Sequence, residues 1–64
     1  MAQRTFSFPN ANRCVKTTAI DRTTNERYQV TAYVPAHIWY MGQLQRIMRE
    51  AGGDWLVLSP LEYG

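Results

Sequence analysis

The sequence is poor in the residues that build disulfide frameworks, metal sites and membrane spans. Its 64 residues include one cysteine and one histidine, so no internal disulfide is available. No apolar run exceeds four residues, as in Trp55 to Leu58, whereas a membrane-spanning helix needs ~20. No apolar stretch typical of a secretory signal follows Met1. A single cysteine suits a reducing compartment, so we expect a cytoplasmic protein.

Charge is also scarce. Charged residues make up 19% of the chain, with seven Lys and Arg against five Asp and Glu, which gives a net charge of +2. Six of the seven cations are arginine, a residue suited to interfaces because its guanidinium forks onto carboxylates and stacks on rings. An excess of +2 permits a nucleic-acid partner without requiring one. A chain of this size buries only ~60% of its unfolded surface, so a partner or self-association is an expected source of stability.

Two stretches in the first half of the chain predict β-strands joined by a turn. Residues 13–20 are rich in β-branched side chains and contain neither glycine nor proline. Residues 27–34 alternate, with one apolar face made of Tyr28, Val30, Ala32 and Val34. The polar residues 21–26 between them favour a turn. The pattern predicts an antiparallel hairpin with one buried and one wet face.

The first twelve residues predict an extended arm. Phe6 and Phe8 flank Ser7, and residues 9–12, Pro-Asn-Ala-Asn, are typical of a turn. Three outcomes stay open for this arm: pairing as a short extra strand, docking of both Phe rings onto a neighbour, or fraying.

The second half changes to helical spacing. Pro35 ends the preceding strand and suits a helix entry, so the helix is expected over residues 36–51. Its apolar stripe follows a three-and-four spacing: Ile38, Met41, Leu44, Met48 and Ala51. Gly42 inside it costs ~1 kcal/mol relative to alanine, which we attribute to close packing on the sheet.

A helix stop and a last strand complete the predicted order. Gly52 and Gly53 supply the C-terminal cap. Residues 54–59 predict a strand that is apolar on both faces, which is typical of a central or doubly covered strand. The prediction is one small α+β domain over residues 13–64, ββαβ in order, with an antiparallel sheet of about three strands and one helix packed on it. The arm, residues 1–12, precedes it.

The helix and its flanks resemble a known family. Val34-Pro35, Trp39-Tyr40, Gln45-Arg46-Ile47 and Gly52-Gly53, in that order and before an apolar strand, resemble the small linker domain of cyanobacterial phycobilisomes. The family includes the allophycocyanin core linker and the phycocyanin rod-cap linker, and a similar domain begins some cyanobacterial ferredoxin–NADP reductases. The resemblance covers residues 13–59. The chain departs from it where Asp54-Trp55-Leu56 replaces Lys-Ile-Val, and its interval from Val-Pro to Gly-Gly is about two residues longer.

The resemblance implies a role in photosynthesis without catalysis. A linker of this class binds no cofactor and caps or fills phycobiliprotein discs on the cytoplasmic face of the thylakoid. It implies that Arg13, Lys16 and other cations meet acidic groups of the disc.

Catalytic and metal sites are not indicated by the residues themselves. His37 is expected at a helix start with no companion ligand. A nucleophilic pair of Cys14 with His37 lacks a third, orienting group. The five carboxylates have no metal-ligand or acid–base spacing: Asp21, Glu26, Glu50, Asp54 and Glu62. We expect no enzyme and no cofactor.

Aromatic and arginine side chains are the candidate partner contacts. Tyr33 shares the wet strand face with Arg27, and Trp39 falls off the apolar stripe of the helix. Trp55 fits either the core or a contact surface. The candidate partner-binding residues are Arg27, Tyr33, Trp39, Arg46, Arg49 and Trp55. They suit a module that docks on a protein assembly. Two alternatives stay open: a nucleic-acid-binding module that stacks bases on the Arg27–Tyr33 face, and a small regulator or inhibitor of a larger enzyme complex.

Overall fold

The centre of the fold is the hairpin that the alternation predicts. A computed structural model describes residues 2–63, in which β2 (Arg13–Asp21) and β3 (Glu26–Val34) pair antiparallel along their whole length. The reversal between them is fixed by Asp21, whose carbonyl accepts from the Asn25 N–H at 2.6 Å. Asn25 adopts a positive φ of 61°, which asparagine tolerates well in turns.

The N-terminal arm forms a strand, and this strand makes the sheet mixed. β1 (Ala2–Ser7) pairs with β3 in parallel, not antiparallel, register. The loop of residues 8–12 crosses the end of β3, held by bonds from Phe8 N–H to the Tyr33 carbonyl and from Asn12 N–H to the Val34 carbonyl, both 3.0 Å. β3 therefore lies between β1 and β2. The expectation of a purely antiparallel sheet was wrong, because this loop spans one strand instead of joining two neighbours.

The helix is shorter than the periodicity predicts. α1 covers Met41–Glu50, because the residues after Pro35 first form a turn in which the Ile38 N–H bonds to the Pro35 carbonyl at 3.1 Å. Tyr40 is the N-cap, with an extended φ of −138°. Gln43 reaches back, and its Oε1 accepts from the N–H of Trp39 at 2.6 Å. The spacing of apolar residues alone does not distinguish this turn from the first turn of a helix.

The two glycine predictions have different outcomes. The helix stop at Gly52 is confirmed: its φ is +102° and its N–H bonds to the Arg49 carbonyl at 3.1 Å. Gly42 does not pack on the sheet. A Cβ there would instead lie 3.1 Å from Cε2 of the exposed Tyr40 ring.

The last strand is short and lies at an edge. β4 (Trp55–Val57) and β5 (Glu62–Tyr63) pair one after the other with the same side of β2. Between β4 and β5, Ser59 takes the place of the strand-to-strand hydrogen bonds with β2. Its Oγ accepts from the Thr18 N–H at 3.0 Å, and its carbonyl accepts from Thr17 Oγ1 at 2.8 Å. A strand is therefore confirmed within residues 54–59, but it covers Trp55–Val57 alone, and the expectation of a central position was wrong.

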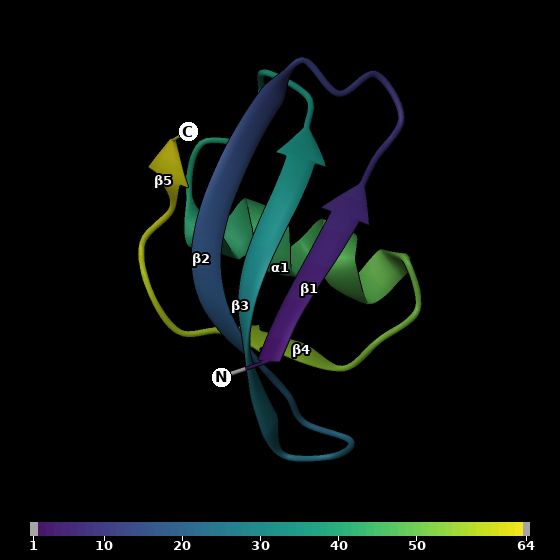
Figure 1. Ribbon diagram of the computed structural model, residues 1–64. Helices are drawn as coiled ribbons and strands as arrows, with labels where there is room; N and C mark the ends of the chain where they lie inside the picture. The colour runs from purple at the N-terminus through teal and green to yellow at the C-terminus, as the bar shows by residue number, and fades with distance from the viewer. Residues whose placement is uncertain (1, 64) are drawn as a thin grey trace.

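The core lies between one face of the sheet and α1 (Figure 1). The strand order is β1-β3-β2-β4, and α1 covers the inner face with Leu44 and Met48, which are fully buried. The sheet curls enough for Trp55 of β4 to reach Phe6 of β1, with ring centroids 5.4 Å apart. The buried apolar residues are Val15, Ala19, Val30, Ala32, Val34, Ile38, Leu44, Met48, Trp55 and Val57. Residues 2–63 thus form a small α+β fold with one helix and a mixed sheet of four to five strands.

Candidate functional site

Exposed aromatic side chains gather where β2 begins and β5 ends. The guanidinium of Arg13 lies 5.3 Å from the ring centroid of Trp39 and 5.0 Å from that of Tyr63. The Tyr63 hydroxyl donates to the Trp39 carbonyl at 2.6 Å. Trp39 is 64% exposed and Tyr63 is 53% exposed. We call Arg13, Trp39 and Tyr63 the aromatic end.

Three distant segments build the aromatic end. Arg13 opens β2, Tyr63 closes β5, and Trp39 sits in the turn before α1. The Gln43 bond to the Trp39 N–H fixes that turn from the helix side. The Tyr63 hydroxyl fixes it from the sheet side, so the exposed indole is carried by an ordered backbone.

Two of the sequence-predicted residues lie at or beside this end. Trp39 belongs to it, and its predicted exposure is confirmed. Tyr33 is 44% exposed and pairs across the hairpin with Cys14, the neighbour of Arg13. Tyr63, by contrast, was missed, because its role depends on the long-range pairing of β5 with β2. As the penultimate residue, Tyr63 has too few neighbours to show a strand pattern.

The other predicted residues lie elsewhere. Arg27 is at the opposite end of β3 from Tyr33, six residues or ~20 Å away along the strand. Arg46 and Arg49 are exposed on α1, at 3.8 Å from Glu50 and 3.9 Å from Asp54 respectively.

The prediction of Trp55 as a partner contact needs correction. Its side chain is 3% exposed and packs edge to face against Phe6 and Tyr28, with both centroid distances 5.4 Å. The curl of the sheet turns this residue inward, so in the folded domain it is a core residue and offers no contact area.

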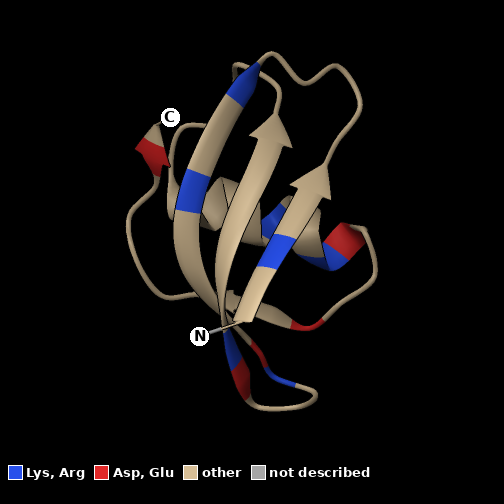
Figure 2. Ribbon diagram, viewed as in Figure 1, with Lys and Arg blue, Asp and Glu red and all other residues tan. Residues whose placement is uncertain are grey.

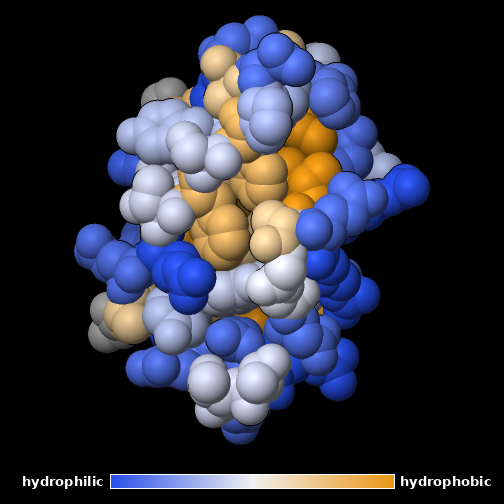
Figure 3. Space-filling model, turned by 90° about the vertical axis from the view of Figure 1, so that its right-hand side faces the viewer, coloured by the Kyte–Doolittle hydropathy of each residue, from blue (hydrophilic) through white to orange (hydrophobic). Residues whose placement is uncertain are grey.

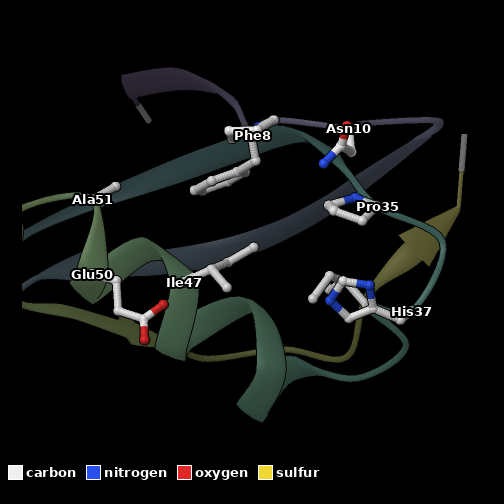
Figure 4. A pocket seen from close by; sticks show the side chains of 9 residues that line it. Phe8, Asn10, Pro35, His37, Ile47, Glu50 and Ala51 are labelled. Carbon is white, nitrogen blue, oxygen red and sulfur yellow. The ribbon is translucent and has the colours of Figure 1, made fainter.

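A second surface is an apolar groove between β1 and α1. Its volume is about 470 Å³, and Figure 4 shows Phe8 and Ile47 approaching from opposite walls, with Pro35 and His37 at one end. Figure 3 shows the same side of the molecule as an apolar hollow framed by hydrophilic residues. The lining residues are Phe8, Pro9, Asn10, Pro35, His37, Ile38, Ile47, Glu50 and Ala51. We call this hollow the β1–α1 groove.

The ionisable side chains do not converge. Among residues 2–63 no group of three or more His, Cys, Asp or Glu side chains could hold a metal ion. Cys14 is free and half-buried on β2, whereas His37 lines the β1–α1 groove. A hydrogen bond to Glu26 raises the pKa of the Tyr28 hydroxyl, at the far end of β3 from the aromatic end.

Comparison with protein-family models, curated proteins and solved structures found no match. The resemblance to phycobilisome linker domains therefore stays a prediction from the sequence. No helix within the described part of the chain is long and apolar enough to cross a membrane.

Charges are dispersed over the described surface. Figure 2 shows Lys and Arg interspersed with Asp and Glu around the molecule, and the cations form no continuous stripe. On the outer sheet face Lys16 lies opposite Glu62 in the pairing of β2 with β5. Such a mixed distribution gives a weak electrostatic footprint for a polyanion.

Proposed function

We propose that this chain is a non-enzymatic protein-binding module that docks on a larger assembly through its aromatic end. The observation that carries the proposal is Trp39, an indole 64% exposed to solvent on an ordered backbone. Trp, Tyr and Arg are the residues enriched at the energetic centres of protein interfaces. The aromatic end consists of one of each.

Ordering before binding strengthens the proposal. Trp39 is held at both of its main-chain polar groups, by Gln43 and by Tyr63, and Arg13 lies over its ring. A contact that is already ordered loses less conformational entropy on association. Covering an aromatic side chain removes roughly 150 Å² or more from water, which corresponds to ~4 kcal/mol at 25 cal/mol per Å².

A protein partner is favoured over a nucleic acid. Stacking of successive bases requires neighbouring aromatic rings along a basic groove. Arg27 and Tyr33 stand at opposite ends of β3, and the outward side of that strand carries one aromatic ring. The dispersed charges give the same preference.

The assembly itself is proposed from the sequence resemblance. Phycobiliprotein discs are the first candidate, with the domain capping or filling a disc on the cytoplasmic face of the thylakoid. Arg46 and Arg49 keep exposed guanidinium groups on α1, which suits orientation toward acidic groups and a faster on-rate. A regulator of a larger enzyme complex would use the same aromatic end, and identification of the partner separates the two.

The test is an affinity pull-down from lysate of the source organism at about 0.1 and 0.5 M salt, with the wild type and Trp39→Ala. We expect one defined complex that persists at high salt and is lost with Trp39→Ala. Leu58→Ala is the matched control, since Leu58 is an exposed apolar residue away from the aromatic end. Recovery of nucleic acid that disappears at high salt, or a complex indifferent to Trp39→Ala, contradicts the proposal.

A further inference from the structure

The outer edge of β1 is open. β1 is the first strand in the order β1-β3-β2-β4, and no described strand pairs with its outer side. The Phe8 N–H points to β3, where it donates to the Tyr33 carbonyl. Main-chain groups alternate in direction along a strand, so Gln3, Thr5 and Ser7 turn their N–H and C=O groups outward.

This edge carries one of the usual devices against pairing, an inward-pointing charge, and lacks the others. Its six residues contain no proline or lysine, and the register with β3 continues from Ala2 to Ser7 without a bulge. The one charged residue, Arg4, points to the inner face, where its guanidinium lies 5.5 Å from the Phe6 ring and 5.6 Å from the Trp55 ring. That position leaves the outward main-chain groups uncovered.

The β1–α1 groove adjoins the open edge. Phe8, which follows β1, stacks on Phe6 with centroids 6.1 Å apart and forms one wall of the groove. Across the groove lie Ile47 of α1 and Ala51, the C-cap residue that follows the helix. A row of unpaired backbone groups beside an apolar hollow is the arrangement that accepts an added strand.

We propose that a second copy of this chain adds its own β1 to this edge, antiparallel about a twofold axis at Thr5. The outward groups of Thr5 would then exchange two hydrogen bonds with Thr5 of the other copy. Gln3 would lie opposite Ser7, and Arg4 opposite Phe6. The two sheets would join into one.

Side-chain complementarity selects both the occupant and the register. The two strands can form main-chain hydrogen bonds only in registers where the outward N–H and C=O groups of one copy face those of the other. A register centred on Arg4 sets two guanidinium groups directly opposite, which is destabilising. In a register centred on Phe6, the two copies of β1 overlap over residues 5–7 alone. The register centred on Thr5 pairs residues 3–7 and sets each Arg4 cation across from an aromatic ring, a favourable contact.

The same axis also shields the grooves. A twofold axis perpendicular to the joined sheet leaves both α1 helices on one face. In the register centred on Thr5, Phe8 falls opposite Ala2 of the other copy, so the beginning of that copy's β1 borders each β1–α1 groove. The apolar wall at Phe8 would then lose water, which rewards association. The aromatic end is unaffected, because β5 pairs with β2, on the opposite side of β3 from β1. The dimer would thus present two aromatic ends and bridge two partners.

The first experiment is site-directed cross-linking in a Cys14→Ser background. A hydrogen-bonded antiparallel pair has Cα atoms ~5.5 Å apart, within the range that a disulfide spans. Thr5→Cys should therefore form a disulfide dimer under mild oxidation. Gln3→Cys is the matched control, because four residues of offset separate the two copies of that position by ~14 Å. Equal cross-linking of both variants, or none with Thr5→Cys, overturns the proposal.

The second experiment measures mass by sedimentation equilibrium. We expect the wild type to reach twice 7.4 kDa with rising concentration, and Thr5→Pro to dissociate at least ten times more readily. Proline removes only an outward N–H there, and Thr5→Val retains that N–H and should dimerise like the wild type. A wild type that stays monomeric up to about 1 mM overturns the proposal. Trp39→Ala should leave the dimer intact. The proposal of partner binding through the aromatic end and the proposal of a β1 dimer are therefore tested separately. If Thr5→Pro loses its folded circular dichroism spectrum, the cross-linking pair decides.

Discussion

Phe6 and Trp55 meet edge to face with ring centroids 5.4 Å apart, although β3 and β2 separate their strands in the sheet order. The contact joins the two ends of the curled sheet on its inner face. It also makes β1 part of the hydrophobic core, so the N-terminal strand contributes to the stability of the whole domain.

Truncation of Phe6 tests that contribution. Phe6→Ala should lower the free energy of unfolding by about 2–3 kcal/mol, somewhat less than a fully buried ring, because Phe6 is half-buried. Urea denaturation followed by circular dichroism measures the change. Gln3→Ala, on the exposed face of the same strand, should change it by less than about 0.5 kcal/mol. Equal effects of the two substitutions would show that the Phe6 ring is not part of the core.

Gly53 is required by the position of the Trp55 indole. A Cβ at Gly53 would collide with Nε1 of that ring and lie 2.6 Å from its Cδ1. Because the indole is 3% exposed and tightly packed, Gly53→Ala should destabilise the domain by about 1–3 kcal/mol.

Gly42→Ala is the matched comparison for Gly53→Ala. Its Cβ would meet the ring of Tyr40, which is 62% exposed and free to shift. Alanine in α1 should then be neutral or stabilise by up to ~1 kcal/mol. Thermal unfolding distinguishes the two glycines. A loss of stability with Gly42→Ala as large as with Gly53→Ala would contradict the packing difference between them.

Ser59 should stabilise the break between β4 and β5. Its Oγ accepts from the Thr18 N–H at 3.0 Å, and that N–H has no ladder partner where the strand is interrupted. Ser59→Ala leaves the donor half-buried and unpaired, so a cost of about 1–2 kcal/mol is expected. Faster amide hydrogen exchange at Thr18 is the specific readout, and Ser59→Thr, which keeps the hydroxyl, should preserve the protection. Unchanged exchange in Ser59→Ala would contradict the role of the hydroxyl.

Tyr63 should act on partner binding through Trp39. Tyr63→Phe removes the 2.6 Å bond to the Trp39 carbonyl but keeps the ring beside Arg13. We expect partner affinity to fall about three- to tenfold, from a bond worth about 0.5–1.5 kcal/mol, while the free energy of unfolding changes by less than about 1 kcal/mol. Trp39→Ala should weaken binding considerably more. A Tyr63→Phe affinity equal to the wild type would show that ordering of the turn does not matter.

Neighbouring residues along the chain were enough to predict the local elements. Alternation from Tyr28 to Val34 needed only neighbouring residues to indicate a strand and its buried face. Gly52 indicated the helix end because glycine readily adopts the positive φ that ends a helix, and this preference belongs to the residue itself. The exposure of Trp39 followed from its place off the apolar stripe, and the α+β class followed from the order of these elements.

Which distant segments meet became visible in the folded chain alone. The parallel pairing of β1, the curl that buries Trp55 and the arrival of Tyr63 beside Arg13 each join residues far apart in the chain. Periodicity records which face of an element is apolar, but it carries no record of which element covers that face. In a domain this small, contacts between distant segments decide whether an aromatic residue fills the core, like Trp55, or remains exposed for a partner, like Trp39.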